Sequence, residues 1–180
     1  MLTSATRRAA GSTGLDLELE FGRLRDDRSR SIVRWETPWG SSGELLIDVV
    51  TFERAVLEVE QRPLVLPYSD LSDAVTLPSM DVHEILASKW LMLDDRGEPR
   101  DLFDLWWALT REVIAFADIA DAHRVMYGYP PMLSSIERAQ RLGGAWEQRL
   151  ARQLSDLPPF EEVLDVIEAA FGEWRDSQTG

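Results

Sequence analysis

The sequence predicts an α+β protein in which a short strand-rich region precedes a long helical region. Three observations favour this class: strict alternation in LDLELEF (15–21), a hairpin pattern in SIVRWETPWGSSGELLIDVVTF (31–52), and helical apolar spacing after Pro78. We expect a strand-rich part over 1–78 and a helical part over 79–180, packed together as one compact unit. The 180 residues, of which 44% are hydrophobic, suffice for a sizeable core.

The strand-rich part predicts three strands. They are expected at 15–21, 31–37 and 44–51, with a turn from Pro38 to Gly43 between the last two. Residues 1–14 are small and polar, and we expect them to be frayed. Prolines at 63, 67 and 78 disfavour any long element between 53 and 78.

The part after Pro78 predicts helices to the end of the chain. Ser79 is the expected N-cap of the first, with Asp81 in its first turn. Gly97 is expected to end that helix and Pro99 to open the next one. The expected helices cover 80–94, 100–115, 117–126, 134–154 (interrupted if Gly143-Gly144 breaks it) and 160–174.

Composition excludes several classes of function. The net charge of −13 disfavours a general DNA-binding module, because an acidic surface repels nucleic acid at long range. A local basic patch remains compatible with this charge, and the densest candidate is Arg23, Arg25, Arg28, Arg30 and Arg34; a solvated loop is the alternative. Cysteine is absent, which excludes disulfides and thiolate metal sites. No apolar run approaches the roughly 18 residues that span a membrane, and no signal-peptide segment opens the chain, so we expect a cytoplasmic protein.

Lys89 is the one lysine among nineteen basic residues, and it lies inside the apolar run ILASKWLML. On the expected helix it shares a stripe with Val82, Leu86 and Leu93. Two interpretations are open: the lysine extends its ammonium into water along an apolar surface, or it is a fixed cation that meets an anionic substrate or a carboxylate in a cleft.

Three carboxylates are further candidates. Asp101 and Asp104 lie three residues apart at the start of the next helix, where they either cap that helix or face a site. Asp48 interrupts the apolar strand LLIDVV, and burial of an unpaired charge there would be costly. It is therefore expected either at an exposed edge or opposite a metal or a cation.

Three stretches in this order resemble the AbiEii-type nucleotidyltransferase toxins of bacterial abortive-infection and toxin–antitoxin systems. LLIDVV resembles the family's strand with one acidic residue, and MDVHEILASKWLMLDDR resembles its lysine-bearing helix. PRDLFDLWWAL resembles its closing Arg-Asp-aliphatic-aromatic-Asp-Leu motif. The likeness covers about residues 31 to 115, and the last two motifs are its specific part.

The resemblance implies a partial polymerase-beta-like nucleotidyltransferase sheet followed by a C-terminal helical bundle. It implies that Asp48 binds Mg²⁺, that Lys89 contacts nucleotide phosphates or carboxylates, and that Asp101 orients Lys89 or acts as a base. Residues in supporting positions are Arg100, Asp104, Glu84 and Arg96. The implied partners are a nucleoside triphosphate, an RNA acceptor (tRNA by family analogy) and a protein antitoxin.

The sequence departs from that family in one respect. No Gly-Ser turn is followed at the family's spacing by Asp-x-Asp; GSTGLDLE (11–18) has the wrong spacing and ends in Asp16-x-Glu18. The family's first strand, first helix and principal metal pair would precede residue 1. We therefore expect either a start assigned too late or a truncated chain that is inactive alone.

Three hypotheses are open at this point. The chain is a nucleotidyltransferase toxin or its C-terminal portion, a catalytically inactive homologue that binds an antitoxin or another chain, or an unrelated α+β domain in which RDLFDLWW is only core packing.

Overall fold

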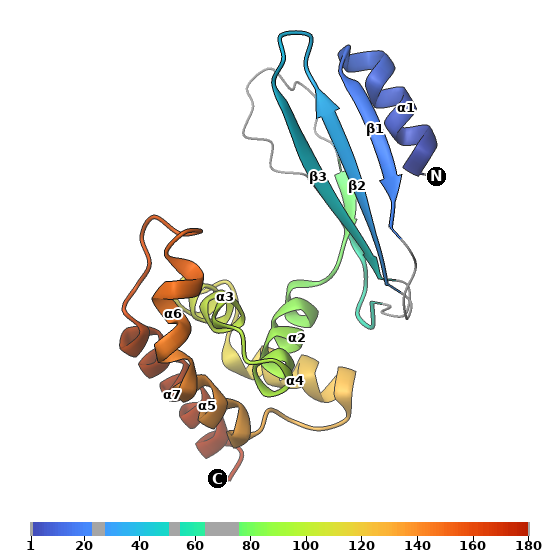
Figure 1. Cartoon of the computed structure of the whole chain (residues 1–180). Coiled ribbons are helices and arrows are strands. Elements are labelled where there is room, and N and C mark those ends of the chain that lie inside the picture. Colours follow the sequence, from blue (N-terminus) through green and yellow to red (C-terminus); the bar gives the residue numbers. More distant parts are fainter. Residues whose placement is uncertain (1, 23–27, 51–54, 64–75, 180) are drawn as a thin grey trace. The chain divides into compact units, whose positions relative to one another are not determined.

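The computed structural model describes residues 2–22, 28–50, 55–63 and 76–179 (Figure 1). Its packing divides the chain into Met1–Arg54, here called the sheet unit, and Ala55–Gly180, here called the helical unit. The chain thus forms two compact units where the sequence led us to expect one.

The change from strands to helices lies where the sequence places it, at residues 78–82. Strand β5 (Thr76–Ser79) is followed by helix α2 (Val82–Asp95). The packing boundary after Arg54 comes earlier because strand β4 (Glu60–Pro63) pairs antiparallel with β5 and belongs to the helical unit. This short hairpin was not expected. Its prolines are tolerated because both strands of a two-stranded sheet are edge strands, and on its outer side an edge strand makes no backbone hydrogen bonds to another strand.

The sheet unit contains three antiparallel strands in the order β1-β2-β3. These strands confirm the expected first strand and hairpin. Their bounds are β1 (Asp16–Phe21), β2 (Arg28–Glu36) and β3 (Ser42–Val50). Leu17 pairs with Trp35 and Leu19 with Val33, so these side chains share one face, while Glu18 and Arg34 share the other.

The turn between β2 and β3 is fixed by its own hydrogen bonds. The amide of Gly40 donates to the carbonyl of Thr37 at 2.9 Å, and the amide of Ser41 donates to the hydroxyl of Thr37 at 2.9 Å. Gly40 has φ +87°, which favours glycine. At Gly43 a side chain would collide with the indole of Trp35, which lies 2.5 Å from the ideal Cβ position.

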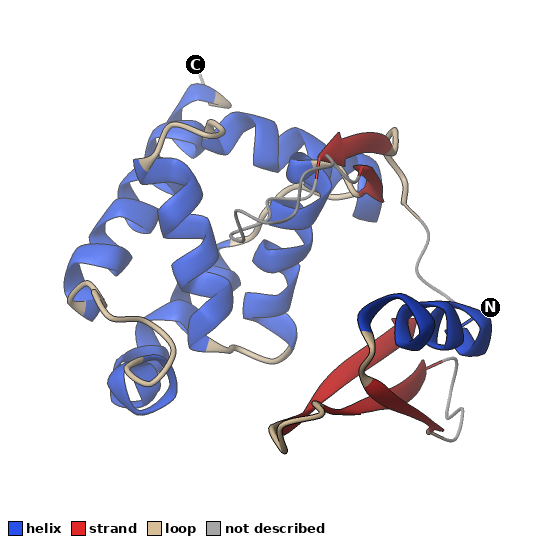
Figure 2. Cartoon of the chain, turned by 90° about the horizontal axis from the view of Figure 1, so that it is seen from above, coloured by secondary structure: helices blue, strands red, loops and turns tan. Residues whose placement is uncertain are grey.

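Helix α1 (Leu2–Thr13) corrects the expectation that residues 1–14 are frayed. Alanine and arginine are good helix formers, and the helix lies along the sheet (Figure 2). Thr6 and Ala9 line an apolar groove of about 500 Å³ together with residues from the apolar face of the sheet. The packing surface that stabilises α1 could not be seen in its own sequence.

The helical unit follows the predicted order of helices with small shifts at the ends. The helices after α2 are α3 (Pro99–Thr110), α4 (Phe116–Tyr127), α5 (Leu133–Ala139), the 3₁₀ turn η1 (Gln140–Leu142), α6 (Gly143–Leu150) and α7 (Phe160–Ser177). The interruption at η1 comes directly before Gly143, close to the glycine pair that suggested it. Asp81, and not Ser79, is the N-cap of α2: its carboxylate accepts from the amide of His83 at 2.8 Å.

The core lies among α2, α3, α4 and α7. Trp90 stacks on Phe171 with ring centroids 5.6 Å apart and meets the edge of Phe116 at 4.9 Å. Leu93 and Leu102 are completely buried beside them. None of the helices in the described part of the chain is both long and apolar enough to cross a membrane.

Candidate functional site

The corner between α2 and α3 determines where Lys89 points. Gly97 has φ +59°, and its amide donates to the carbonyl of Met92 at 3.0 Å, which ends α2 as predicted. Pro99 opens α3, also as predicted. Because the two helices are joined so tightly, the first turn of α3 lies beside the middle of α2.

Four charged side chains meet at this corner, and we call them the Lys89 cluster: Lys89, Arg96, Asp101 and Asp104. The ammonium of Lys89 lies 3.1 Å from Asp101 Oδ1 and 2.7 Å from Asp104 Oδ2. Arg96 donates to both oxygens of Asp101, Nε to Oδ2 at 2.9 Å and Nη2 to Oδ1 at 2.8 Å. Of the two interpretations that the sequence left open for Lys89, the one in which it meets a carboxylate agrees with the geometry.

Burial is uneven within the Lys89 cluster. Asp101 is completely buried, whereas the side chains of Lys89 and Asp104 are 25% and 44% exposed. The hydrogen bond to Asp101 is the main cause that raises the pKa of Arg96 above its usual value. Lys89 carries three N–H donors, and two carboxylates engage it, so a further acceptor can still approach from solvent.

Glu84 lies on the same helix but is engaged elsewhere. Its side chain is buried, and its carboxylate accepts from the amides of Val56 and Leu57 at 3.0 Å. These contacts tie the segment before β4 to α2. Glu84 therefore positions the backbone and makes no hydrogen bond with Lys89, Arg96, Asp101 or Asp104.

Arg100 is adjacent to Asp101 in the chain but lines a different cavity. That cavity measures about 190 Å³ and is bounded by Glu98, Arg100, Arg149, Leu150 and Gln153. The first turn of α3 therefore presents Asp101 toward α2 and Arg100 toward the end of α6. Sequence reasoning did not single out Arg149; the available signal was the high density of arginine in residues 138–152.

Asp48 lies in the sheet unit and is exposed. Arg30, directly opposite on β2, donates to both of its oxygens, Nε to Oδ1 at 2.7 Å and Nη2 to Oδ2 at 2.9 Å. The hydrogen bond from Arg30 is the main cause that lowers the pKa of Asp48. The sequence left two interpretations of Asp48 open, an exposed position and a position opposite a cation or metal. The structure shows an exposed Asp48 that faces a cation, Arg30.

The basic patch expected at residues 23–34 is neutralised where the structure describes it. Arg30 is paired with Asp48, and Arg34 bridges Glu44 at 2.9 Å and Glu20 at 2.6 Å. Arg23 and Arg25 lie outside the described residues. Arg30 and Arg34 thus pair with carboxylates of neighbouring strands.

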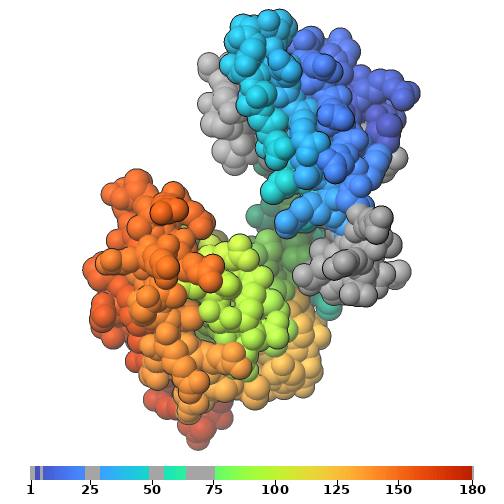
Figure 3. All heavy atoms as spheres, viewed as in Figure 1, coloured from blue at the N-terminus to red at the C-terminus, as the bar shows by residue number. Residues whose placement is uncertain are grey.

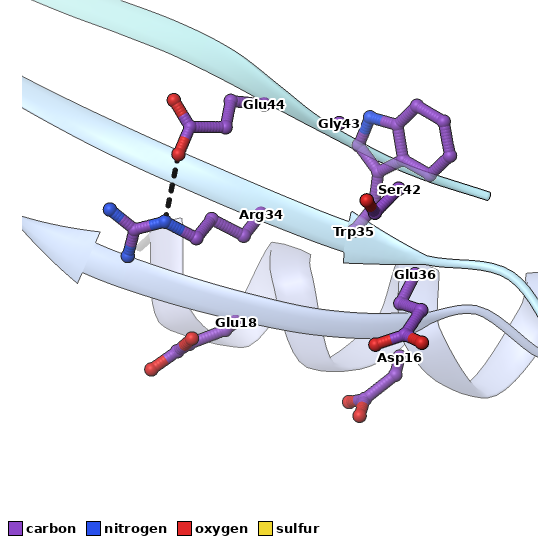
Figure 4. Close-up of a pocket in the computed structure, with 8 residues that line it drawn as sticks. All are labelled: Asp16, Glu18, Arg34, Trp35, Glu36, Ser42, Gly43 and Glu44. Atoms are coloured by element: carbon purple, nitrogen blue, oxygen red, sulfur yellow. Dashed lines mark hydrogen bonds and ion pairs between the residues drawn. The ribbon is translucent and has the colours of Figure 1, made fainter. Parts of the chain in front are cut away.

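The charged face of the sheet holds a shallow acidic pocket of about 280 Å³ (Figure 4). Asp16 and Glu36 are directly paired across the strands, and their carboxylates lie close together in the picture. Glu18 lines the same pocket, and no ion pair engages any of these three carboxylates within the described parts of the chain.

The donor set does not fit the magnesium site that the resemblance implies. Among the residues that the structure describes, no three side chains of His, Asp or Glu are grouped so as to hold a metal ion. Asp48 is held by Arg30, and Asp101 by Lys89 and Arg96.

Comparison with known proteins identifies the family of the chain. The model of the family described as "Nucleotidyl transferase AbiEii toxin, Type IV TA system" matches residues 4–166. The crystal structure of JHP933 from Helicobacter pylori is similar with a TM-score of 0.53 and 14% identity, over 92% of this chain and 68% of that chain. That similarity shows the fold alone. No curated protein matches the chain. Because the family model matches most of the sequence, a range that contains all four residues of the Lys89 cluster, the chain belongs to the AbiEii nucleotidyl transferase toxin family.

Proposed function

We propose that this chain acts in a toxin–antitoxin system by transferring a nucleotide from a nucleoside triphosphate to an RNA acceptor, with tRNA as the first candidate. The observation that carries the proposal is the Lys89 cluster, in which a partly exposed ammonium is held between a buried and a half-exposed carboxylate. Such a reaction would take place in the cytoplasm, where both substrates are found.

The reaction is a substitution at phosphorus. A hydroxyl oxygen of the RNA attacks the α-phosphorus, a new phosphodiester bond forms, the bond between the α- and β-phosphates breaks, and pyrophosphate leaves. The hydroxyl proton passes to solvent or a base. Catalysis of this kind depends on positioning and on neutralising the phosphate oxygens.

Lys89 supplies positive charge for the triphosphate. Its ammonium is in contact with Asp104, a carboxylate that is 44% exposed and can turn to solvent at little cost when a phosphate oxygen takes its place. Asp101 cannot turn in this way because it is buried and also held by Arg96. The cluster therefore keeps the lysine aimed while leaving one of its contacts exchangeable.

Asp101 acts as a positioning residue and not as a base in this proposal. Both of its oxygens accept hydrogen bonds from cations, and its side chain has no exposure to solvent or to an attacking hydroxyl. Mg²⁺ is added to the assay because the family resemblance implies it, and Asp48 has no assigned role because the described residues offer no fitting metal site.

The test is transfer of label to RNA. The purified chain is incubated with total tRNA, Mg²⁺ and each of the four α-labelled nucleoside triphosphates in turn. We expect label in tRNA with the wild type, loss of at least about a hundredfold with Lys89→Ala since a charge-stabilising contact is removed, and little change with Arg111→Ala, an exposed arginine outside the cluster. Omission of Mg²⁺ tests the metal requirement.

A wild-type chain that labels no RNA, but binds tightly to the product of a neighbouring gene, would instead support the interaction protein that the sequence left open. Equal activity of Lys89→Ala and wild type would contradict the role given to the lysine. Suppression of label transfer by the product of the partner gene would identify it as the antitoxin.

A further inference from the structure

The segment from Arg138 to Gln153 reverses the charge of the chain locally. It contains four arginines and one acidic residue, Glu147, in a protein of net charge −13. The segment includes η1 and α6, and the atoms of this region, orange in the space-filling view, form a continuous part of the surface of the helical unit (Figure 3).

The arginines of this segment are free of carboxylates. Arg138, Arg141, Arg149 and Arg152 are all exposed, and none forms an ion pair within the described residues. Several arginines elsewhere, among them Arg30, Arg34 and Arg96, are held by acids. An unpaired arginine surface on an acidic protein favours an anion from outside the chain.

The cavity between α3 and the end of α6 gives this charge a defined place. Arg100 comes from the first turn of α3 and Arg149 from the last turn of α6, and both line the same space of about 190 Å³. Gln153 lines it too, and its side-chain Nε2 donates a hydrogen bond to the carbonyl of Arg149 at 3.1 Å. Glu98 is the acidic member of the lining, but it forms no ion pair with either arginine.

We propose that Arg100 and Arg149 bind a phosphate of the acceptor RNA backbone, with the remaining arginines of the segment extending the contact along the strand. This inference rests on the proposed function. A guanidinium forms a fork of N–H donors that matches the oxygens of a phosphodiester, and two forks from different helices can hold one phosphate from two sides.

The placement explains how an acidic protein can hold RNA. Long-range repulsion by the net charge is overcome only where unpaired cations meet the backbone at short range. Arg100 directly precedes Asp101 in the first turn of α3, so the phosphate that it binds lies at the same helix end as the carboxylate that contacts Lys89. The RNA is thereby held at the start of α3, the same turn that presents Asp101 to Lys89, where the triphosphate is expected.

The experiment measures binding of fluorescently labelled total tRNA to the whole chain without nucleotide, over a range of KCl concentrations. The test variant is Arg100→Gln with Arg149→Gln. The control is Arg111→Gln with Arg7→Gln, which makes the same change in net charge at two exposed arginines outside this surface. Circular dichroism checks that each variant is folded. If the double variant is not folded, the single variant Arg149→Gln replaces it.

We expect the test variant to bind tRNA about tenfold more weakly than the control at moderate salt, as charged hydrogen bonds of ordinary strength predict. The slope of log K against log salt should fall by about 0.7 to 0.9, the value for one phosphate contact. Equal loss in test and control variants, or no tRNA binding by the wild type, would overturn the inference.

A second arm separates RNA phosphates from nucleotide phosphates. Binding of a fluorescent ATP analogue should be the same in the test variant and the wild type. If ATP binding falls while tRNA binding holds, the cavity serves the nucleotide and the inference is wrong. Preferential capture of an acidic polypeptide over tRNA would overturn it as well. The assay contains no catalysis, so its result stands even if the chain transfers no label.

Discussion

Two ion pairs of identical chemistry occupy opposite environments in this molecule. In the sheet unit, Arg30 donates hydrogen bonds to Asp48 from Nε and Nη2, and both side chains are more than half exposed. In the helical unit, Arg96 grips Asp101 in the same way, but Asp101 has no exposure at all. The distances of 2.7 to 2.9 Å do not distinguish the two pairs.

The difference shows that contact geometry alone does not identify a site. An exposed pair gains little because water screens its charges and solvates either partner when it is alone. A buried carboxylate depends on its cations, since removal of one leaves a charge without solvent. The same bidentate contact is thus replaceable in the sheet and essential at the corner of α2 and α3.

The largest effect is expected for Asp101→Asn. The amide keeps the shape but removes the charge between Lys89 and Arg96, and we expect the free energy of unfolding to fall by about 3 kcal/mol. Urea denaturation followed by the fluorescence of the buried Trp90 and Trp146 measures it. A loss below about 1 kcal/mol would mean that the buried Arg96–Asp101 pair contributes no more to the free energy of unfolding than an exposed pair does.

Glu84→Gln sharpens the comparison, because Glu84 is buried like Asp101 but is held by backbone amides and not by cations. The amide group would turn an N–H toward the amides of Val56 and Leu57, and we expect a loss of about 2 kcal/mol. Hydrogen exchange at those two amides should accelerate. The exposed Glu137→Gln is the control, and equal exchange in both variants would contradict the role of Glu84.

The smallest effect is expected for Asp48→Asn. The Arg30 contact lowers the pKa of Asp48 below its ordinary 3.8, so whatever stability the pair contributes is present above that pH and is lost as the pH falls through the lower folded value. Because the pair is exposed, we expect wild-type and variant stability to coincide from neutral pH down to acid unfolding. A difference in stability at neutral pH that disappears in acid would show instead that the exposed Arg30–Asp48 pair stabilises the fold measurably.

The Lys89 cluster could be predicted largely from sequence because its signals are local. The apolar stripe of α2, the glycine that ends it and the proline that opens α3 all lie within eighteen residues, and together they place Lys89 near Asp101. The role of Arg96 as a second cation on Asp101 followed only from the structure.

The sheet unit was less predictable because its contacts depend on distant segments. The partner of Asp48 is set by the register of β2 against β3, and that register appears only when both strands are paired. Helix α1 is stabilised by the sheet that it covers, so its short polar sequence gave no sign of order. Proline signals excluded a long element before Ser79 but not the short hairpin that formed.

The connection between α2 and α3 is only three residues long, Arg96–Glu98, and it fixes the sequence separation between Lys89 and Asp101. Lys89 and Asp101 are twelve positions apart, and inserting one residue between them would rotate the start of α3 by about 100° relative to α2. Insertions and deletions should therefore accumulate elsewhere in divergent relatives. In relatives with low overall sequence identity, a lysine followed twelve positions later by an aspartate should therefore be a better search signature than the sequence of the strands.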